Sequence, residues 1–145
     1  GSYAALTLCT VFEHLIEHDI WLDQANRVLE PGGLFITLQP TAPFANFMGR
    51  LMRLGNLQAQ LPSVHQVFHP PWHTAFFSID GMKQIVERHG FKMVDLRPAP
   101  QGRESGITGV IQRGLNIVNQ VGWRLVGRPW PLLTAHVFIF EKLPG

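Results

Sequence analysis

Residues 26–39 read Asn-Arg-Val-Leu-Glu-Pro-Gly-Gly-Leu-Phe-Ile-Thr-Leu-Gln, which is a helix end, a tight turn and a strand in direct succession. The apolar side chains of residues 20–29 recur with helical spacing and share one face, so we predict a helix there, capped by Asp19. The Pro-Gly-Gly at 31–33 stops that helix and turns the chain. The apolar run 34–39 then predicts a strand.

The segment before this helix, residues 3–9, is short, apolar and free of helix or strand breakers. We predict a strand buried on both faces, in a central position of a sheet rather than at its edge. Strand, helix, tight turn and strand in this order predict a parallel pair with a right-handed crossover. The sequence is therefore typical of an α/β protein.

The second half of the chain continues the alternation of helices and strands. Ser78 caps a predicted helix that Gly90 ends, and residues 91–96 and 136–142 are predicted strands. Residues 102–127 predict a glycine-interrupted helix with an apolar stripe, flanked by arginines. Such a helix could lie on a membrane surface. We favour a stripe that covers the sheet and do not expect membrane association.

Length, composition and charge restrict the possible classes of protein. The chain has 145 residues and 46% hydrophobic residues, which suits one folded domain over 1–145. Twelve basic and ten acidic residues are too evenly balanced to indicate a nucleic-acid partner. No apolar run reaches the roughly 18 residues that a membrane span needs. With Cys9 alone no disulfide can form within the chain, which is typical of a cytoplasmic protein.

The first residues suggest an artificial start. Gly1 and Ser2 resemble the remainder of a cloning site, and Tyr3 follows directly inside an apolar run. We therefore expect the N-terminus to be a cut within a larger domain.

Three stretches together resemble one family. They are Val-Phe-Glu-His-Leu at 11–15, Asn-Arg-Val-Leu-Glu-Pro-Gly-Gly-Leu at 26–34 and His-Thr-Ala-Phe-Phe-Ser at 73–78, followed by a helix and Gly-Phe at 90–91. In this order and spacing they are similar to class I S-adenosylmethionine-dependent methyltransferases of the small-molecule type. The pattern covers residues 3–96.

The resemblance implies a partial Rossmann-like sheet with flanking helices. Its strands would be the fourth to seventh of the family's seven, with the last one antiparallel. The family's Gly-x-Gly-x-Gly loop and the acidic residue that ends its second strand would precede Tyr3, and the 145 residues contain no such loop. Ala4 stands where the family usually has Asp. The chain should thus be the C-terminal part of an enzyme, inactive alone and binding S-adenosylmethionine weakly or not at all.

The resemblance also suggests roles for residues after the first strand. The backbone of Cys9 and Thr10 would lie beside the methionine part of the cofactor. His14 would act as a general base or orient the methyl acceptor, because imidazole exchanges protons near neutral pH. Glu13 would contact the acceptor. A strand end and a local pairing of Glu13 with His14 would explain the same residues without any chemistry.

The long irregular region 41–77 is predicted to form a loop or cap on the acceptor side. His73 and Phe76 would contact a small-molecule acceptor there, although aromatic residues beside a loop are more often ordinary core. His65, His69 and His73 recur every four residues, as metal ligands on a helix would. Two intervening prolines exclude a regular helix, so we expect no metal site.

A second hypothesis is a non-catalytic interaction module. In this interpretation the first strand pairs through its exposed edge with a partner, or with a second copy to form a homodimer.

Overall fold

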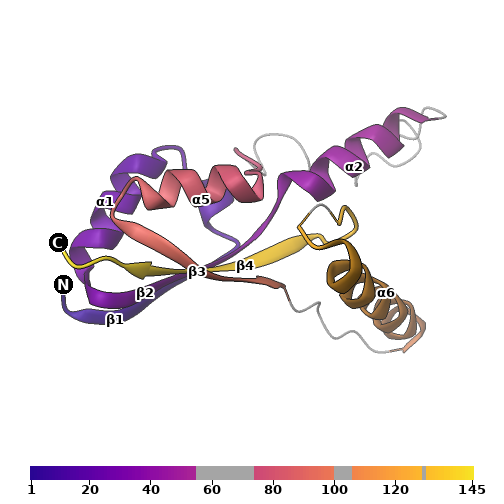
Figure 1. Cartoon of the computed structure of the whole chain (residues 1–145). Helices are drawn as coiled ribbons and strands as arrows, with labels where there is room; N and C mark the ends of the chain where they lie inside the picture. Colours follow the sequence, from indigo (N-terminus) through magenta and orange to yellow (C-terminus); the bar gives the residue numbers. More distant parts are fainter. Residues whose placement is uncertain (55–73, 100–105, 129) are drawn as a thin grey trace.

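The computed structural model describes residues 1–54, 74–99, 106–128 and 130–145, with only the backbone for 106–112. A four-stranded sheet carries helices on its surface and at one end (Figure 1). The elements in chain order are β1 (Tyr3–Cys9), the 3₁₀ turn η1 (Phe12–His14), α1 (His18–Val28), β2 (Leu29–Pro40), α2 (Ala42–Arg53), α5 (Ile79–Glu87), β3 (Phe91–Pro98), α6 (Gly106–Val126) and β4 (Ala135–Lys142).

The strands lie in the order β1-β2-β4-β3. β1 runs parallel to β2, which confirms the predicted parallel pair. β4 is inserted between β2 and β3 and is antiparallel to both. The sheet order and the antiparallel last strand therefore agree with the α/β fold expected from the sequence.

The core lies between one face of the sheet and the helices α1 and α5. In Figure 1 these two helices cover the same side of the sheet, with α1 packed on β2 and α5 on β3. Phe35 of β2 lies opposite Phe140 of β4, and their rings stack with centroids 6.0 Å apart. Apolar side chains from both layers complete this core: Leu8, Phe12, Leu22, Ala25, Leu29, Ile79, Met82, Val86, Phe91 and Phe138.

The first strand is less buried than the sequence predicts. β1 lies at the edge of the sheet, and among its side chains only Leu8 is buried. Among the described residues β2 alone pairs with β1, and α1 and α5 lie mainly over the other strands. The expected central position of β1 concerns a complete sheet with further strands beside it, and it stays a prediction.

The predicted cap of α1 is also wrong. The helix begins at His18, and Glu17 occupies the N-cap position without a side-chain hydrogen bond. Asp19 lies in the first turn, where its carboxylate oxygen is 2.9 Å from Nε2 of His89, while Asp23 is 2.7 Å from Nδ1. Burial alone would lower the pKa of His89, but the two carboxylates outweigh it and raise that pKa. Asp19 therefore joins α1 to the end of α5 instead of capping α1.

The Pro-Gly-Gly turn lies within β2 rather than before it. β2 begins at Leu29, and Tyr3 pairs with Leu29 while Ala5 pairs with Leu34. The intervening residues form an irregularity in the ladder, in which Gly32 has φ of 79°. This positive φ explains why the turn needs a glycine.

The N-terminus of α5 follows the predicted pattern. Ser78 is the N-cap, and its hydroxyl oxygen accepts a hydrogen bond of 2.9 Å from the backbone N–H of Gly81. We expect Ser78→Ala to lower the free energy of unfolding by about 1 kcal/mol, because this donor loses its partner. Urea unfolding followed by circular dichroism would measure the change. Glu17→Ala is the matched control, because Glu17 occupies the N-cap of α1 without a side-chain hydrogen bond. This variant should change the free energy of unfolding by only about a few tenths of a kcal/mol. Equal losses in the two variants would contradict the capping argument.

The long helix α6 does not place its apolar stripe on the sheet. It spans Gly106–Val126, within the predicted range 102–127. Val121 is 49% and Leu125 81% exposed, so the expectation of a covering stripe is wrong for the part of the helix whose side chains are described. No helix in the described part of the chain combines the length and apolarity that crossing a bilayer requires.

Candidate functional site

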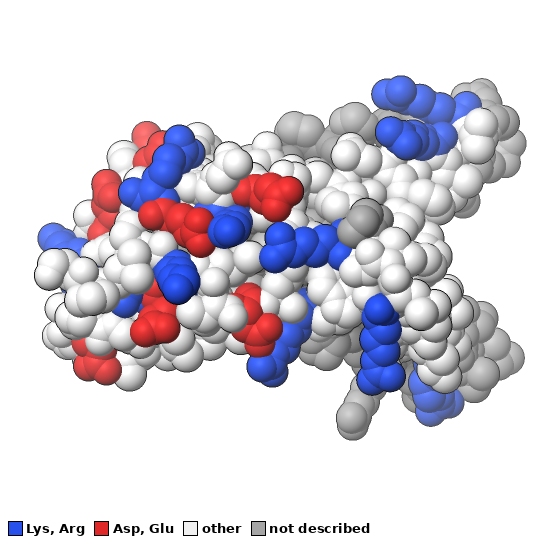
Figure 2. All heavy atoms as spheres, viewed as in Figure 1, with Lys and Arg blue, Asp and Glu red and all other residues white. Residues whose placement is uncertain are grey.

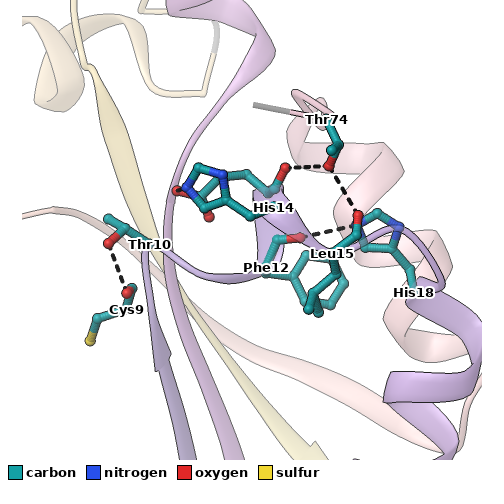
Figure 3. A network of polar contacts seen from close by, with 8 residues as sticks. Cys9, Thr10, Phe12, His14, Leu15, His18 and Thr74 are labelled. Carbon is teal, nitrogen blue, oxygen red and sulfur yellow. Dashed lines mark hydrogen bonds and ion pairs between the residues drawn. The ribbon is translucent and has the colours of Figure 1, made fainter. Parts of the chain in front are cut away.

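The end of β1 is the first part of the candidate site. Directly after Cys9, Thr10 adopts φ of 53°, the positive φ of a left-handed conformation that costs a non-glycine residue about 1–2 kcal/mol. Its backbone N–H donates to the carbonyl of Leu38 at 2.8 Å, and its hydroxyl donates to the carbonyl of Cys9 at 2.8 Å (Figure 3). These bonds hold the chain in a sharp turn at the carboxyl end of the parallel pair.

The turn leads into η1, which carries Glu13 and His14. The Glu13 side chain is 1% exposed, whereas that of His14 is 42% exposed. Nε2 of His14 lies 3.9 Å from Oε1 of Glu13. The structure thus brings a buried carboxyl group and an accessible imidazole together just beyond the sheet.

A segment about sixty residues further along the chain is hydrogen-bonded to η1. The hydroxyl of Thr74 donates to the carbonyls of Glu13 at 2.6 Å and Leu15 at 3.0 Å (Figure 3). The backbone N–H groups of Thr74 and Ala75 also donate to the Glu13 carbonyl, at 3.0 and 3.2 Å. The C-terminal end of the predicted acceptor-side cap is therefore part of the same site.

Aromatic contacts support the underside of η1. The ring of His18 lies 4.8 Å from that of Phe12 and 5.0 Å from that of Phe77, and His18 Nε2 is 3.0 Å from the Phe12 carbonyl oxygen. Phe77 also packs against Phe12, with ring centroids 5.6 Å apart. These contacts fix the position of η1 relative to both α1 and the start of α5.

A buried polar cluster at the same end of the sheet was not predicted. Gln39 of β2 lies opposite His136 of β4, and both are 0% exposed. Nδ1 of His136 is 2.9 Å from the hydroxyl of Thr41, which is also fully buried. Among the described residues, neither the Gln39 amide nor Nε2 of His136 has a hydrogen-bond partner. The cluster adjoins the turn described above, because Gln39 directly follows Leu38, whose carbonyl binds Thr10.

Burial determines the charge of this cluster. It lowers the pKa of His136 from 6.5 to about 4, so the imidazole is neutral at physiological pH. The ring of Trp123 from α6 packs on it at 5.1 Å between centroids. Gln39 and His136 can therefore donate and accept hydrogen bonds without carrying charge.

The predicted site residues fall into two groups. Cys9, Thr10, Glu13 and His14 lie together at the end of β1, as the sequence suggests. Phe76 is half-buried in the segment that follows Thr74, and His73 lies outside the described residues. The chemical roles of these residues stay predictions.

The proposed histidine series cannot be compared with the structure, since His65 and His69 also lie outside the described residues. Within the described ranges no three His, Cys, Asp or Glu side chains cluster closely enough to hold a metal ion.

The chain is an α/β domain whose candidate site lies at the carboxyl ends of its parallel pair, the edge at which ligands of open α/β sheets bind. A family model described as a methyltransferase domain matches residues 1–96, so the chain belongs to the methyltransferase-domain family, whose members use S-adenosylmethionine.

Solved structures with the same fold are distant in sequence. An S-adenosylmethionine-dependent methyltransferase from Archaeoglobus fulgidus is 14% identical with a TM-score of 0.55, over 97% of this chain and 60% of that one. The cyclopropane synthase MmaA2 from Mycobacterium tuberculosis is 11% identical with a TM-score of 0.54, over 97% and 56%. The chain thus spans little more than half the length of these structures. No curated protein sequence matches it.

Proposed function

We propose that the chain is the acceptor-side part of an S-adenosylmethionine-dependent methyltransferase that acts on a small molecule. The observation that carries the proposal is the convergence of Thr10, Glu13, His14 and Thr74 at the carboxyl end of β1 and β2. Ligands of open α/β sheets bind at this edge. Membership of the methyltransferase-domain family supports the reaction type.

The residues present suit one side of the cofactor. Cys9 is exposed at the strand end, and the turn at Thr10 directs the chain away from that position. The 145 residues include no Gly-x-Gly-x-Gly segment to receive the methionine carboxylate, so residues outside them would hold most of the cofactor. When bound, S-adenosylmethionine supplies an already activated methyl group.

The other residues would act on the acceptor. His14 is exposed enough to reach a hydroxyl group and can accept its proton as the oxygen is methylated. Phe76 and His73 would lie on the side formed by the 41–77 region.

Cofactor binding tests the proposal. We expect isothermal titration of this chain with S-adenosylmethionine to give a dissociation constant in the millimolar range or weaker, because the glycine-rich segment is absent. Adenosine serves as the control ligand, because it lacks the methionine part beside which Cys9 and Thr10 would lie and should therefore bind no better than S-adenosylmethionine. Micromolar binding of S-adenosylmethionine by these residues would contradict the proposed division of the site.

The exposed edge of β1 favours a second candidate, a non-catalytic module that pairs with a partner or a second copy. Sedimentation equilibrium separates the candidates, because a chain that remains monomeric at high concentration would exclude self-pairing through β1.

A further inference from the structure

The outward face of α6 is apolar, which is unusual for an exposed helix. Ile117, Val118, Val121 and Leu125 recur at helical spacing and are between 47% and 81% exposed. The opposite face is anchored to the rest of the domain, where Asn119 is 4% exposed and accepts a hydrogen bond of 2.9 Å from Nε1 of Trp130. We call these four exposed side chains the apolar stripe. One face of α6 thus contacts its own domain, and the opposite, apolar face is exposed.

Arginines accompany the apolar stripe. Arg113 and Arg124 are about three turns apart, so they lie along the same edge of α6, beside Ile117 and Val121. Both arginines are exposed, and neither forms an ion pair with any described residue. The sequence of α6 contains no Asp or Glu. An apolar face bordered by arginines without acidic residues is the pattern of helices that lie in a membrane interface.

The helix α2 adds positive charge at the same end of the molecule. It also lacks acidic residues, and its last turn carries Arg50 and Arg53, both exposed. In Figure 2 the charged groups of the described residues at the end that contains α2 and α6 are basic, whereas the acidic groups gather toward α1 and α5. Arg128 differs from Arg113 and Arg124, since it lies 3.6 Å from Asp80 of α5.

This charge distribution selects among possible occupants of the apolar stripe. A second copy packed stripe to stripe would bring the arginines of both copies together with no acidic residue on either helix to pair with them. An anionic lipid surface offers both an apolar layer for the stripe and phosphates for the arginines. Charge complementarity therefore favours lipid over a second copy.

We propose that α6 binds peripherally to the surface of an anionic bilayer, with the apolar stripe in the interface and Arg113 and Arg124 on lipid phosphates. Arg50 and Arg53 of α2 strengthen the attraction from the same end of the molecule. The proposal is independent of the methyl-transfer function, because it uses none of the residues at the ends of β1 and β2.

Vesicle co-sedimentation tests it, with vesicles of phosphatidylcholine mixed with phosphatidylglycerol and vesicles of phosphatidylcholine alone. We expect the chain to sediment with the anionic vesicles and to be released as salt rises. Arg113→Glu with Arg124→Glu should lower the partition coefficient by at least about 25-fold, at about fivefold for each arginine lost, and repulsion of the two new carboxylates lowers it further. Val121→Glu with Leu125→Glu should abolish binding, since the stripe could no longer enter the interface.

The matched control carries the same charge change elsewhere. Arg27 and Arg88 are exposed at α1 and at the end of α5, so Arg27→Glu with Arg88→Glu should leave most of the binding intact. Circular dichroism would verify that each variant keeps its helices. Equal loss in the control, equal binding to neutral vesicles, or no binding to anionic vesicles at low salt would overturn the proposal. A dimer that Val121→Glu with Leu125→Glu converts to a monomer would assign the stripe to a second copy instead.

Discussion

Phe35→Ala is expected to lower the free energy of unfolding by about 3–5 kcal/mol. The Phe35 side chain is 0% exposed and lies in the centre of the phenylalanine cluster of the core. Its ring is 5.8 Å from that of Phe91, 6.0 Å from that of Phe140 and 6.3 Å from that of Phe12. These neighbours come from three different elements, so truncation leaves a cavity that they cannot fill without moving the sheet against η1.

Folded domains are typically stable by about 5–15 kcal/mol, so a loss of this size is a large fraction of that stability and equals the whole of it at the lower limit. Urea unfolding monitored by circular dichroism would therefore show a large shift of the midpoint or a chain already unfolded in buffer. Ile36→Ala is the matched control, since Ile36 is next in β2 but half-buried on the opposite face. Ile36→Ala should lower the free energy of unfolding clearly less than Phe35→Ala does. Equal losses for the two positions would contradict the assignment of the core to the face covered by α1 and α5.

Periodicity and turn residues made most of the elements predictable from the sequence. The strand at 3–9, the helix after Ser78 and its end before Gly90 all occur where local patterns predict them. In each case the determining residues lie within one or two turns of the element that they define. Local physical chemistry was sufficient there, because capping, φ preference and side-chain alternation act over short stretches of chain.

The errors arise where distant residues intervene. Asp19 has the side chain of a good helix cap, but His89, seventy residues away, binds it in the first turn instead. The apolar spacing of α6 identifies a helix with an apolar face but does not say what that face contacts. Burial of β1 likewise depends on which strands pair with it, and the sequence of residues 3–9 contains no information on that.

The candidate site was predictable only where it is contiguous in sequence. Cys9 to His14 form one short stretch, so a single motif was enough to group them. Gln39 and His136 come together only through the register of β2 against β4. A signal did exist, because Gln39 is four residues from the buried Phe35 and His136 two residues from the buried Phe138, so each shares the face of its phenylalanine. Without the strand order, that signal could not join the two residues into one cluster.

Loss of stability between pH 6.5 and 4 is the second large effect that we expect, and His136 should cause much of it. Burial lowers its pKa from 6.5 to about 4 in the folded state, so in this window the unfolded chain binds a proton that the folded chain does not. The free energy of unfolding therefore falls as pH falls, by up to about 1.4 kcal/mol for each pH unit. Over the whole window this amounts to about 3 kcal/mol, and below pH 4 the contribution stays lost.

His136→Gln should remove this acid dependence while keeping a polar side chain beside Thr41. The measurement is the free energy of unfolding against pH for wild type and variant, and the prediction concerns the difference in slope rather than the absolute stability. His89→Gln is the informative control, because the pKa of His89 is raised. The stabilisation by His89 is complete below pH 6.5 and is lost as pH rises through the raised pKa. The His89→Gln variant should therefore keep the wild-type slope between pH 6.5 and 4, and its slope should differ from that of the wild type only at higher pH. If His136→Gln retains the wild-type slope in acid, His136 is not held neutral by burial, and the uncharged hydrogen-bonding role inferred for it and Gln39 loses its basis.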